Sequence, residues 1–314
     1  MALVRKEAYF NSSNGKNKIR TLIWQDDELT PVGVVQLTHG MAEHIARYDE
    51  FARFLASNGF VVCGNDHLGH GKSIDSRAQL GTMGASNGDK RLVDDMHILT
   101  RIMKKRYPEL PYFLFGHSLG SFCAAVYAVH FGEELNGLIL SGSGTMPSLF
   151  SVAAGGMDKL VEKYGYMKKF DKMPEMMNKT FSSMTDDKEL PLAWLSYNPE
   201  NRLAYSNDDL CGFTYTLGGY RDIYNIMREA SEDRWPYRLP KNLKVMMISG
   251  ADDPVGFKGR GVLTTADRLT QAGFDPTVIL YPGMRHEILH ETEKEVVFRD
   301  VLNFLFSVYS STEN

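Results

Sequence analysis

The decapeptide YFLFGHSLGS spans residues 112–121 and contains a serine, Ser118, set between Gly116 and Gly120. Four apolar residues precede this G-x-S-x-G pattern, as in a short buried strand. Apolar residues at helical spacing follow it: Leu119, Phe122, Val126 and Val129. Between a strand and a helix, the pattern forms a tight turn that lifts the serine hydroxyl clear of the sheet edge. The segment therefore predicts a catalytic nucleophile at Ser118 in an α/β fold.

Strands and helices alternate on both sides of this turn. Short apolar runs predict strands at residues 32–39, 60–66, 112–118, 135–142, 243–250 and 277–283. Segments with the apolar period of a helix lie between most of these runs. Such alternation predicts a mainly parallel central sheet with helices on both faces. An Asn-Gly pair at residues 14–15, between two further apolar runs, predicts an additional hairpin within residues 6–30.

The alternation stops after Gly144 and resumes only near residue 241. We therefore expect a core formed by residues 1–144 and 241–314, and an insert at 145–240. The insert holds eight of the sixteen methionines: Met146, Met157, Met167, Met173, Met176, Met177, Met184 and Met227. Methionine is flexible and polarizable, so such an insert suits an adaptable apolar binding surface. Packing within the insert's own small core is the alternative interpretation.

The composition restricts the class of protein. Among 314 residues, 43% are hydrophobic and 24% are charged, which is typical of a globular chain and unlike a disordered, collagen-like or membrane-spanning one. The net charge of −4 disfavours a nucleic-acid binder. The start, MALVRKEAYF, carries charges where a signal peptide has its apolar run, so we expect an intracellular, cytoplasmic protein. The cysteines Cys63, Cys123 and Cys211 lack paired spacing and are expected to be buried, without disulfide or zinc.

A serine nucleophile needs a base, and the base needs an acid that orients it. In this architecture the acid follows a late strand and the histidine follows the last strand. The first position holds Asp252 and Asp253, of which we favour Asp253 because it is third after Gly250 and directly before a proline. Asp252 stays an alternative. His286 is the predicted base, and His290, one helical turn further, is its alternative.

An acyl-transfer enzyme also needs hydrogen-bond donors for the oxyanion that forms on the carbonyl. The backbone N–H of Leu119, at the start of the predicted helix, is the first candidate. The second is expected in the loop after the strand at 32–39. Gly40 permits an unusual turn there, which makes the N–H of Met41 the expected partner.

The segment DHLGHGKS at residues 66–73 resembles two other kinds of site. Gly71-Lys72-Ser73 matches the end of a phosphate-binding loop, but Asp66 stands where that motif has glycine. His67 and His70 could bind a metal ion, yet the sequence has no second ligand cluster. We interpret both histidines as packing within a loop and expect no metal site.

Six segments resemble the α/β-hydrolase superfamily, and within it the monoacylglycerol lipase and lysophospholipase group. They are HGMAEHIARY (39–48), NDHLGHGKS (65–73), GHSLGS (116–121), SNDDLCGF (206–213), GADDPVG (250–256) and GMRHEILHE (283–291). The resemblance implies a serine hydrolase without a cofactor, whose insert is a helical cap that admits one acyl chain. It also implies the catalytic set Ser118, Asp253 and His286, with the amides of Met41 and Leu119. Asp209 departs from the family, which usually has proline there, as does the richness of the cap in methionine.

We expect Ser118 to attack a small-molecule carboxylic ester with one acyl chain, such as a monoacylglycerol or lysophospholipid. One alternative is an aminopeptidase on the same scaffold, which needs acidic groups in the insert to hold the substrate's ammonium. The insert offers Glu162, Glu175, Asp186, Asp187 and Glu189. A second alternative is a ligand-binding protein with little turnover. The cap is expected to make at most weak peripheral contact with a membrane, and the sequence does not indicate the oligomeric state.

Overall fold

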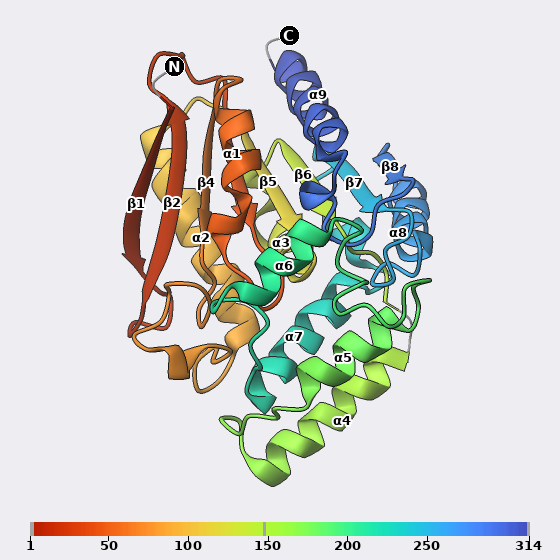
Figure 1. Cartoon of the computed structure of the whole chain (residues 1–314). Coiled ribbons are helices and arrows are strands. Elements are labelled where there is room, and N and C mark those ends of the chain that lie inside the picture. The colour runs from red at the N-terminus through yellow and green to blue at the C-terminus, as the bar shows by residue number, and fades with distance from the viewer. Residues whose placement is uncertain (1–2, 147–148, 313–314) are drawn as a thin grey trace.

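The computed structural model describes residues 3–146 and 149–312, which form one eight-stranded sheet with helices around it (Figure 1). The strand order is β1-β2-β4-β3-β5-β6-β7-β8. The strands are β1 (Leu3–Asn11), β2 (Lys18–Asp26), β3 (Gly33–Thr38), β4 (Phe60–Asn65), β5 (Tyr112–His117), β6 (Gly137–Ser141), β7 (Lys244–Gly250) and β8 (Thr277–Tyr281). β1 and β2 form the predicted hairpin and β2 is antiparallel to β4, whereas the remaining pairs are parallel. The prediction of a mainly parallel α/β sheet is confirmed.

Helices cover both faces of the sheet. α1 (Asp49–Ala56) and α9 (Lys294–Thr312) pack on one face, and α2 (Gly88–Arg106), α3 (Leu119–Phe131) and α8 (Arg260–Gln271) pack on the other. Successive side chains of a strand alternate between the faces, so Val34 joins one buried cluster and Val35 the other. Burial on both sides explains why the core strands are continuous apolar runs.

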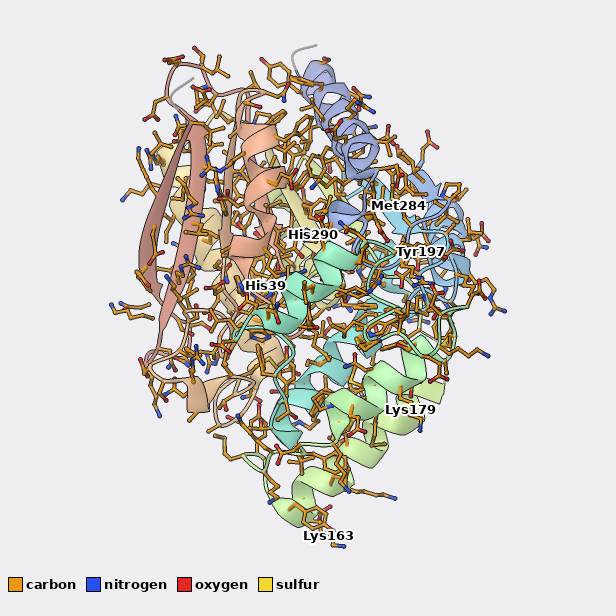
Figure 2. The ribbon with its side chains drawn as sticks, in the orientation of Figure 1. His39, Lys163, Lys179, Tyr197, Met284 and His290 are labelled. Atoms are coloured by element: carbon orange, nitrogen blue, oxygen red, sulfur yellow. The ribbon has the colours of Figure 1, made fainter. Side chains whose placement is uncertain are left out.

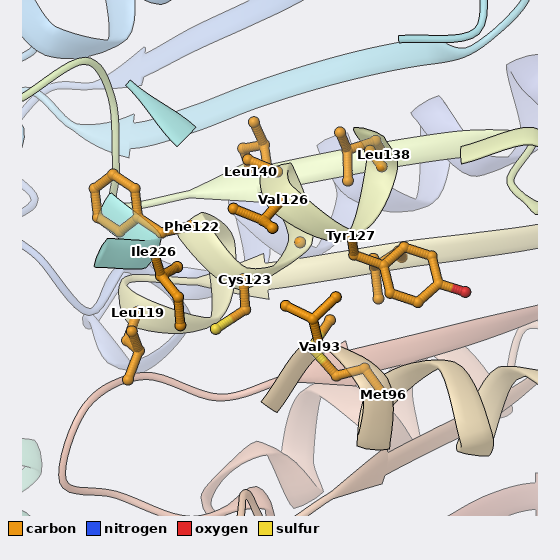
Figure 3. Close-up of a cluster of buried hydrophobic side chains, with 14 of the residues drawn as sticks. Val93, Met96, Leu119, Phe122, Cys123, Val126, Tyr127, Leu138, Leu140 and Ile226 are labelled. Atoms are coloured by element: carbon orange, nitrogen blue, oxygen red, sulfur yellow. The ribbon is translucent and has the colours of Figure 1, made fainter. Parts of the chain in front are cut away.

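In the described part of the segment between β6 and β7 there are four α-helices: α4 (Leu149–Tyr164), α5 (Met173–Ser182), α6 (Pro199–Asn207) and α7 (Leu217–Ala230). The start of α7 is fixed by the side chain of Thr216, which accepts a hydrogen bond from Gly219 N at 3.0 Å. Figure 1 shows α4 and α5 farthest from the sheet, while α7 lies against α3. In Figure 3, Ile226 of α7 lies next to Leu119 and Phe122 of α3. The apolar contact between α7 and α3 therefore joins the segment between β6 and β7 to the helices that cover the sheet.

Short 3₁₀ helices complete the described elements. They are η1 (Ile45–Tyr48), η2 (Arg77–Gln79), η3 (Gly132–Glu134), η4 (Trp235–Arg238) and η5 (Ile288–His290). None of the helices in the described ranges has the length and apolar character that crossing a bilayer requires.

The division into a core and an insert at 145–240 stays a proposal, and residues 147–148 of that insert lie outside the described ranges. The prediction that all three cysteines are buried is wrong for Cys211, which is half-buried and lies within 4.8 Å of the polar atoms of His44 and Asp208.

The parallel strands bring their carboxyl ends to one edge of the sheet. β3 ends at Thr38, β5 at His117, β7 at Gly250 and β8 at Tyr281. Each candidate catalytic residue lies within five residues of one of these ends. The topology alone thus gathers segments that are more than 200 residues apart, and ligands of open α/β sheets bind at this edge.

Candidate active site

Ser118 lies at the sharp turn between β5 and α3. Its φ of 52° and ψ of −121° are rare for a residue with a side chain and cost about 1–3 kcal/mol. The flanking glycines make the turn possible, because a Cβ on Gly116 would lie 2.4 Å from Gly120 O, and one on Gly120 would lie 2.2 Å from Thr38 O. The strained serine borders a cavity of about 400 Å³, as expected of a group presented for reaction.

Asp253 and His286 form a buried hydrogen-bonded pair. His286 Nδ1 lies 2.9 Å from Asp253 Oδ2, so the ring nitrogen donates to the carboxylate. Asp253 is itself fixed by Ser249 Oγ at 3.2 Å and by the backbone N–H of Val255 at 2.8 Å. Burial lowers the pKa of His286, but the charge and hydrogen bond of Asp253 outweigh it and raise the pKa above its ordinary value. The pair can therefore hold an imidazolium.

Asp252 and His290, the alternatives to Asp253 and His286, have different surroundings. Asp252 is partly exposed and accepts a hydrogen bond from Tyr197 OH at 3.3 Å. His290 packs edge-on against the ring of Tyr48, and among the described residues it does not line the cavity that contains Ser118. Burial lowers the pKa of His290 to about 4. The geometry thus favours Asp253 and His286 over their alternatives.

Met41 and Leu119 both line the cavity beside Ser118. Leu119 is the first residue of α3, where a backbone N–H has no partner within the helix. In the β3 loop, the N–H of Gly40 donates to Glu43 Oε1 at 2.5 Å and that of Ala42 donates to Tyr215 OH at 2.7 Å. Among residues 3–146 and 149–312, no group accepts from the intervening N–H of Met41, so it can donate to a ligand. These two amides are the candidates for an oxyanion hole.

A buried charge network supports the two loops that carry the amide and the histidine. The guanidinium of Arg47 pairs with Glu43 Oε2 at 2.7 Å and with both carboxylate oxygens of Glu287 at 2.5 and 2.7 Å. Asn201 completes it, donating to Glu287 at 2.7 Å. Burial raises the pKa of Glu287, but Arg47 outweighs that effect and the pKa is lowered overall. Sequence reasoning missed this network. The position of Glu287 directly after His286 indicated a residue near the site. Its partner Arg47 could not be inferred, because the two residues are 240 positions apart in the sequence.

The walls of the cavity are mostly apolar. Six of the eight methionines of the insert line it: Met146, Met173, Met176, Met177, Met184 and Met227. Met157 packs in the hydrophobic core instead, and Met167 is exposed. Trp194 closes one side, with its ring 5.3 Å from that of His286. At these six positions the structure supports the binding-surface interpretation.

The histidines of the 66–73 segment pack around the end of β3. The rings of His39 and His67 are 4.2 Å apart, and the backbone N–H of His67 donates to His39 Nε2 at 3.0 Å. Burial lowers the pKa of His67 to about 4 and that of His70 to about 3, so both are neutral near pH 7.

A metal ion would need ligand atoms that converge. Within residues 3–146 and 149–312, one group has this arrangement: His44, Asp208 and Cys211, whose ligand atoms lie within 4.8 Å of one another. His44 Nε2 and Asp208 Oδ2 already bond to each other at 2.8 Å. Among the described residues, those that surround Ser118 form no further group of this kind.

Known proteins are similar to this chain in sequence and in architecture. The profile of the family described as Hydrolase_4, serine aminopeptidase S33, matches residues 30–293. A monoacylglycerol lipase of Mycolicibacterium smegmatis is 26% identical over 91% of both chains, and a monoglyceride lipase of Mus musculus is 30% identical over 85% of this chain and 79% of its own. A solved carboxyl esterase from Bacillus coagulans, in complex with glycerol, has a TM-score of 0.91 and 30% identity over 98% of this chain and 99% of its own.

Proposed function

The chain belongs to the serine aminopeptidase S33 family, and we propose that it is a serine hydrolase of carboxylic esters that carry one acyl chain. The observation that carries the proposal is the shared cavity: strained Ser118 and the Asp253-paired His286 border one mostly apolar space. The lipase and esterase names of the relatives support ester hydrolysis. Monoacylglycerols and lysophospholipids are the proposed substrates.

In the proposed reaction, His286 Nε2 takes the proton of Ser118 Oγ while that oxygen attacks the ester carbonyl carbon. The N–H groups of Met41 and Leu119 donate to the carbonyl oxygen as it becomes an oxyanion. His286 returns the proton to the alcohol oxygen as the ester bond breaks, which leaves the acyl group on Ser118. Water then loses a proton to His286 and attacks the acyl carbon, and the acid departs as Ser118 regains its proton.

The charges around the cavity favour an ester over an aminoacyl substrate. The five acidic residues of the insert that could hold an ammonium, at positions 162, 175, 186, 187 and 189, are absent from the described lining of the cavity. The two acidic residues that do line it, Glu43 and Glu287, are both paired with Arg47. A free ammonium group would therefore enter the cavity without an unpaired carboxylate to hold it, at a substantial desolvation cost.

The test compares p-nitrophenyl esters of increasing chain length with aminoacyl p-nitroanilides. We expect ester hydrolysis to dominate and to fall by at least about 10³-fold in Ser118→Ala. Ser143→Ala, which removes a buried hydroxyl outside the cavity lining, is the matched control and should keep the wild-type rate. Faster cleavage of the anilides would favour the aminopeptidase, and binding of lipid without any product would favour the ligand-binding protein.

The outer helices of the insert are the proposed site of weak membrane contact. Figure 2 shows Lys163 on α4 and Lys179 on α5. Three apolar side chains close to these lysines in the sequence expose more than half of their surface: Tyr164, Met167 and Met176. Exposed apolar side chains beside lysines suit the boundary of an anionic bilayer. Co-sedimentation with vesicles should increase when phosphatidylserine is added to phosphatidylcholine, and should decrease in Met167→Asp. Equal sedimentation of both proteins would contradict the contact.

A further inference from the structure

Ala42 follows the proposed oxyanion donor, the N–H of Met41, and adopts a left-handed backbone with φ of 52°. Its peptide groups are held from both sides by the insert. The N–H of Ala42 donates to Tyr215 OH at 2.7 Å. Its carbonyl oxygen accepts from Gly212 N at 2.9 Å and from Tyr205 OH at 3.1 Å. A strained residue of a core loop is therefore fixed by three groups that lie more than 160 positions further along the chain.

The hydroxyl of Tyr215 has a defined direction. Because it accepts from the N–H of Ala42, its own proton is available for His70 Nε2, which lies 2.5 Å away. His70 Nδ1 lies 3.1 Å from the carbonyl oxygen of Leu68, so Nδ1 carries the ring proton and Nε2 accepts. The hydrogen bonds thus run in one direction: Ala42 N–H donates to Tyr215, Tyr215 donates to His70, and His70 donates to the carbonyl oxygen of Leu68.

The chain of bonds is buried and does not titrate near neutral pH. The Tyr215 side chain and His70 are fully buried. Burial lowers the pKa of His70 to about 3, and burial also raises the pKa of Tyr215 well above its ordinary value. The ring of Tyr215 is further fixed by the neighbouring rings of His70, Phe213 and Tyr220, whose centroids are 5.3 to 5.4 Å away. The hydroxyl therefore stays in one position.

We propose that Tyr215, held by His70, is a positioning residue for the oxyanion hole, an inference that rests on the proposed function. The N–H of Ala42 belongs to the peptide group between Met41 and Ala42, so the bond to Tyr215 fixes that group. This limits the rotation of the neighbouring peptide group between Gly40 and Met41, which carries the proposed oxyanion donor. Glu43 holds the other side of the loop through Gly40 N. One of the two proposed oxyanion donors, the N–H of Met41, would then depend on how the insert packs against this loop. Tyr215 itself touches no reacting atom.

The direct test is Tyr215→Phe, which removes one oxygen and retains the ring. Deleting an oxyanion donor costs about 10²–10³ in kcat. Here the donor is loosened and not lost, so we expect kcat to fall about 5- to 50-fold with KM changed less than about twofold. Binding of an alkylboronic acid, whose tetrahedral adduct with Ser118 places an oxygen in the hole, should weaken by a similar factor. Binding of 1-decanol, which forms no adduct, should not change.

Tyr127→Phe is the matched control, because Tyr127 is equally buried and its hydroxyl donates to Thr100 Oγ1 at 2.9 Å, away from the cavity. It should lower the melting temperature to a similar extent and leave kcat unchanged. If Tyr215→Phe does not fold, His70→Leu removes the acceptor of the same hydroxyl and should lower kcat in the same direction.

A wild-type kcat in Tyr215→Phe, or an equal loss of decanol and boronic acid binding, would overturn the inference. The Ser118→Ala variant separates this failure from that of the proposed function. If Ser118→Ala is inactive while Tyr215→Phe is fully active, only the positioning role is wrong. If Ser118→Ala retains the wild-type rate, the proposed function is wrong as well.

Discussion

The polar and apolar sides of the cavity are built in different ways. On the polar side, the groups are held by directional hydrogen bonds, such as those that His286 donates to Asp253 and Arg47 donates to Glu287. On the apolar side, methionines from α5 and its neighbours share the lining with aromatic rings and have no directional contact to lose. Single atoms should therefore control the chemistry, whereas chain preference should change gradually as contact area changes.

The largest effect is expected on the polar side, in Asp253→Asn. An amide can no longer stabilise an imidazolium at His286, and the corresponding change in serine proteases lowers kcat about 10⁴-fold. We expect a loss of about 10³–10⁴ in kcat for a p-nitrophenyl ester. Asp252→Asn is the control, because Asp252 bonds Tyr197 and not the histidine, and it should stay within about threefold of wild type. Equal losses in both variants would contradict the assignment.

Arg47→Met tests whether the network that joins the two loops is essential for stability. The variant leaves the buried carboxylates of Glu43 and Glu287 without a counter-charge, so unfolding free energy should fall by about 3–5 kcal/mol. Urea unfolding measures this. Arg53→Met breaks the exposed pair with Asp49 and should cost less than about 1 kcal/mol. A similar cost in both variants would show that burial of the network matters little.

The pH dependence of kcat/KM reports the pKa of His286 in its pair with Asp253. The base must be neutral, and Asp253 raises the pKa of His286 above the ordinary value of about 6.5. Activity should therefore fall as the pH drops through a midpoint above about 6.5, about tenfold per pH unit below it. Burial lowers the pKa of the neighbouring His117 well below its ordinary value, so His117 should add no second midpoint in this range. A midpoint below 6 would contradict the raised pKa.

The smallest effect is expected on the apolar side. Met177→Ala removes part of the cavity wall, and a loss of about 1 kcal/mol of contact would lower kcat/KM about 3- to 10-fold for a decanoate ester. The acetate ester, which is too short to reach much of that wall, should be cleaved at the wild-type rate. Met167→Ala, which alters an exposed methionine, should change neither rate. A loss of acetate hydrolysis in Met177→Ala would show that this wall also positions the catalytic groups.

The same contrast explains what could be predicted from the sequence. The core strands fall within one or two residues of the predicted ranges, because strands buried on both faces are continuous apolar runs. The positions of Ser118, Asp253 and His286 follow from the ends of those strands, although their catalytic roles stay predictions. The contacts of Tyr215 with Ala42 and of Arg47 with Glu287 could not be predicted, because they join distant loops without a local pattern.

The central claim is that Ser118 is the nucleophile, activated by the buried pair of Asp253 and His286. Peptide mass mapping after reaction with a fluorophosphonate probe tests it most directly. We predict one adduct, on the peptide that contains Ser118, and much slower labelling in Asp253→Asn. An enzyme that hydrolyses esters while Ser118 stays unlabelled, or that carries its adduct on another residue, would contradict the account.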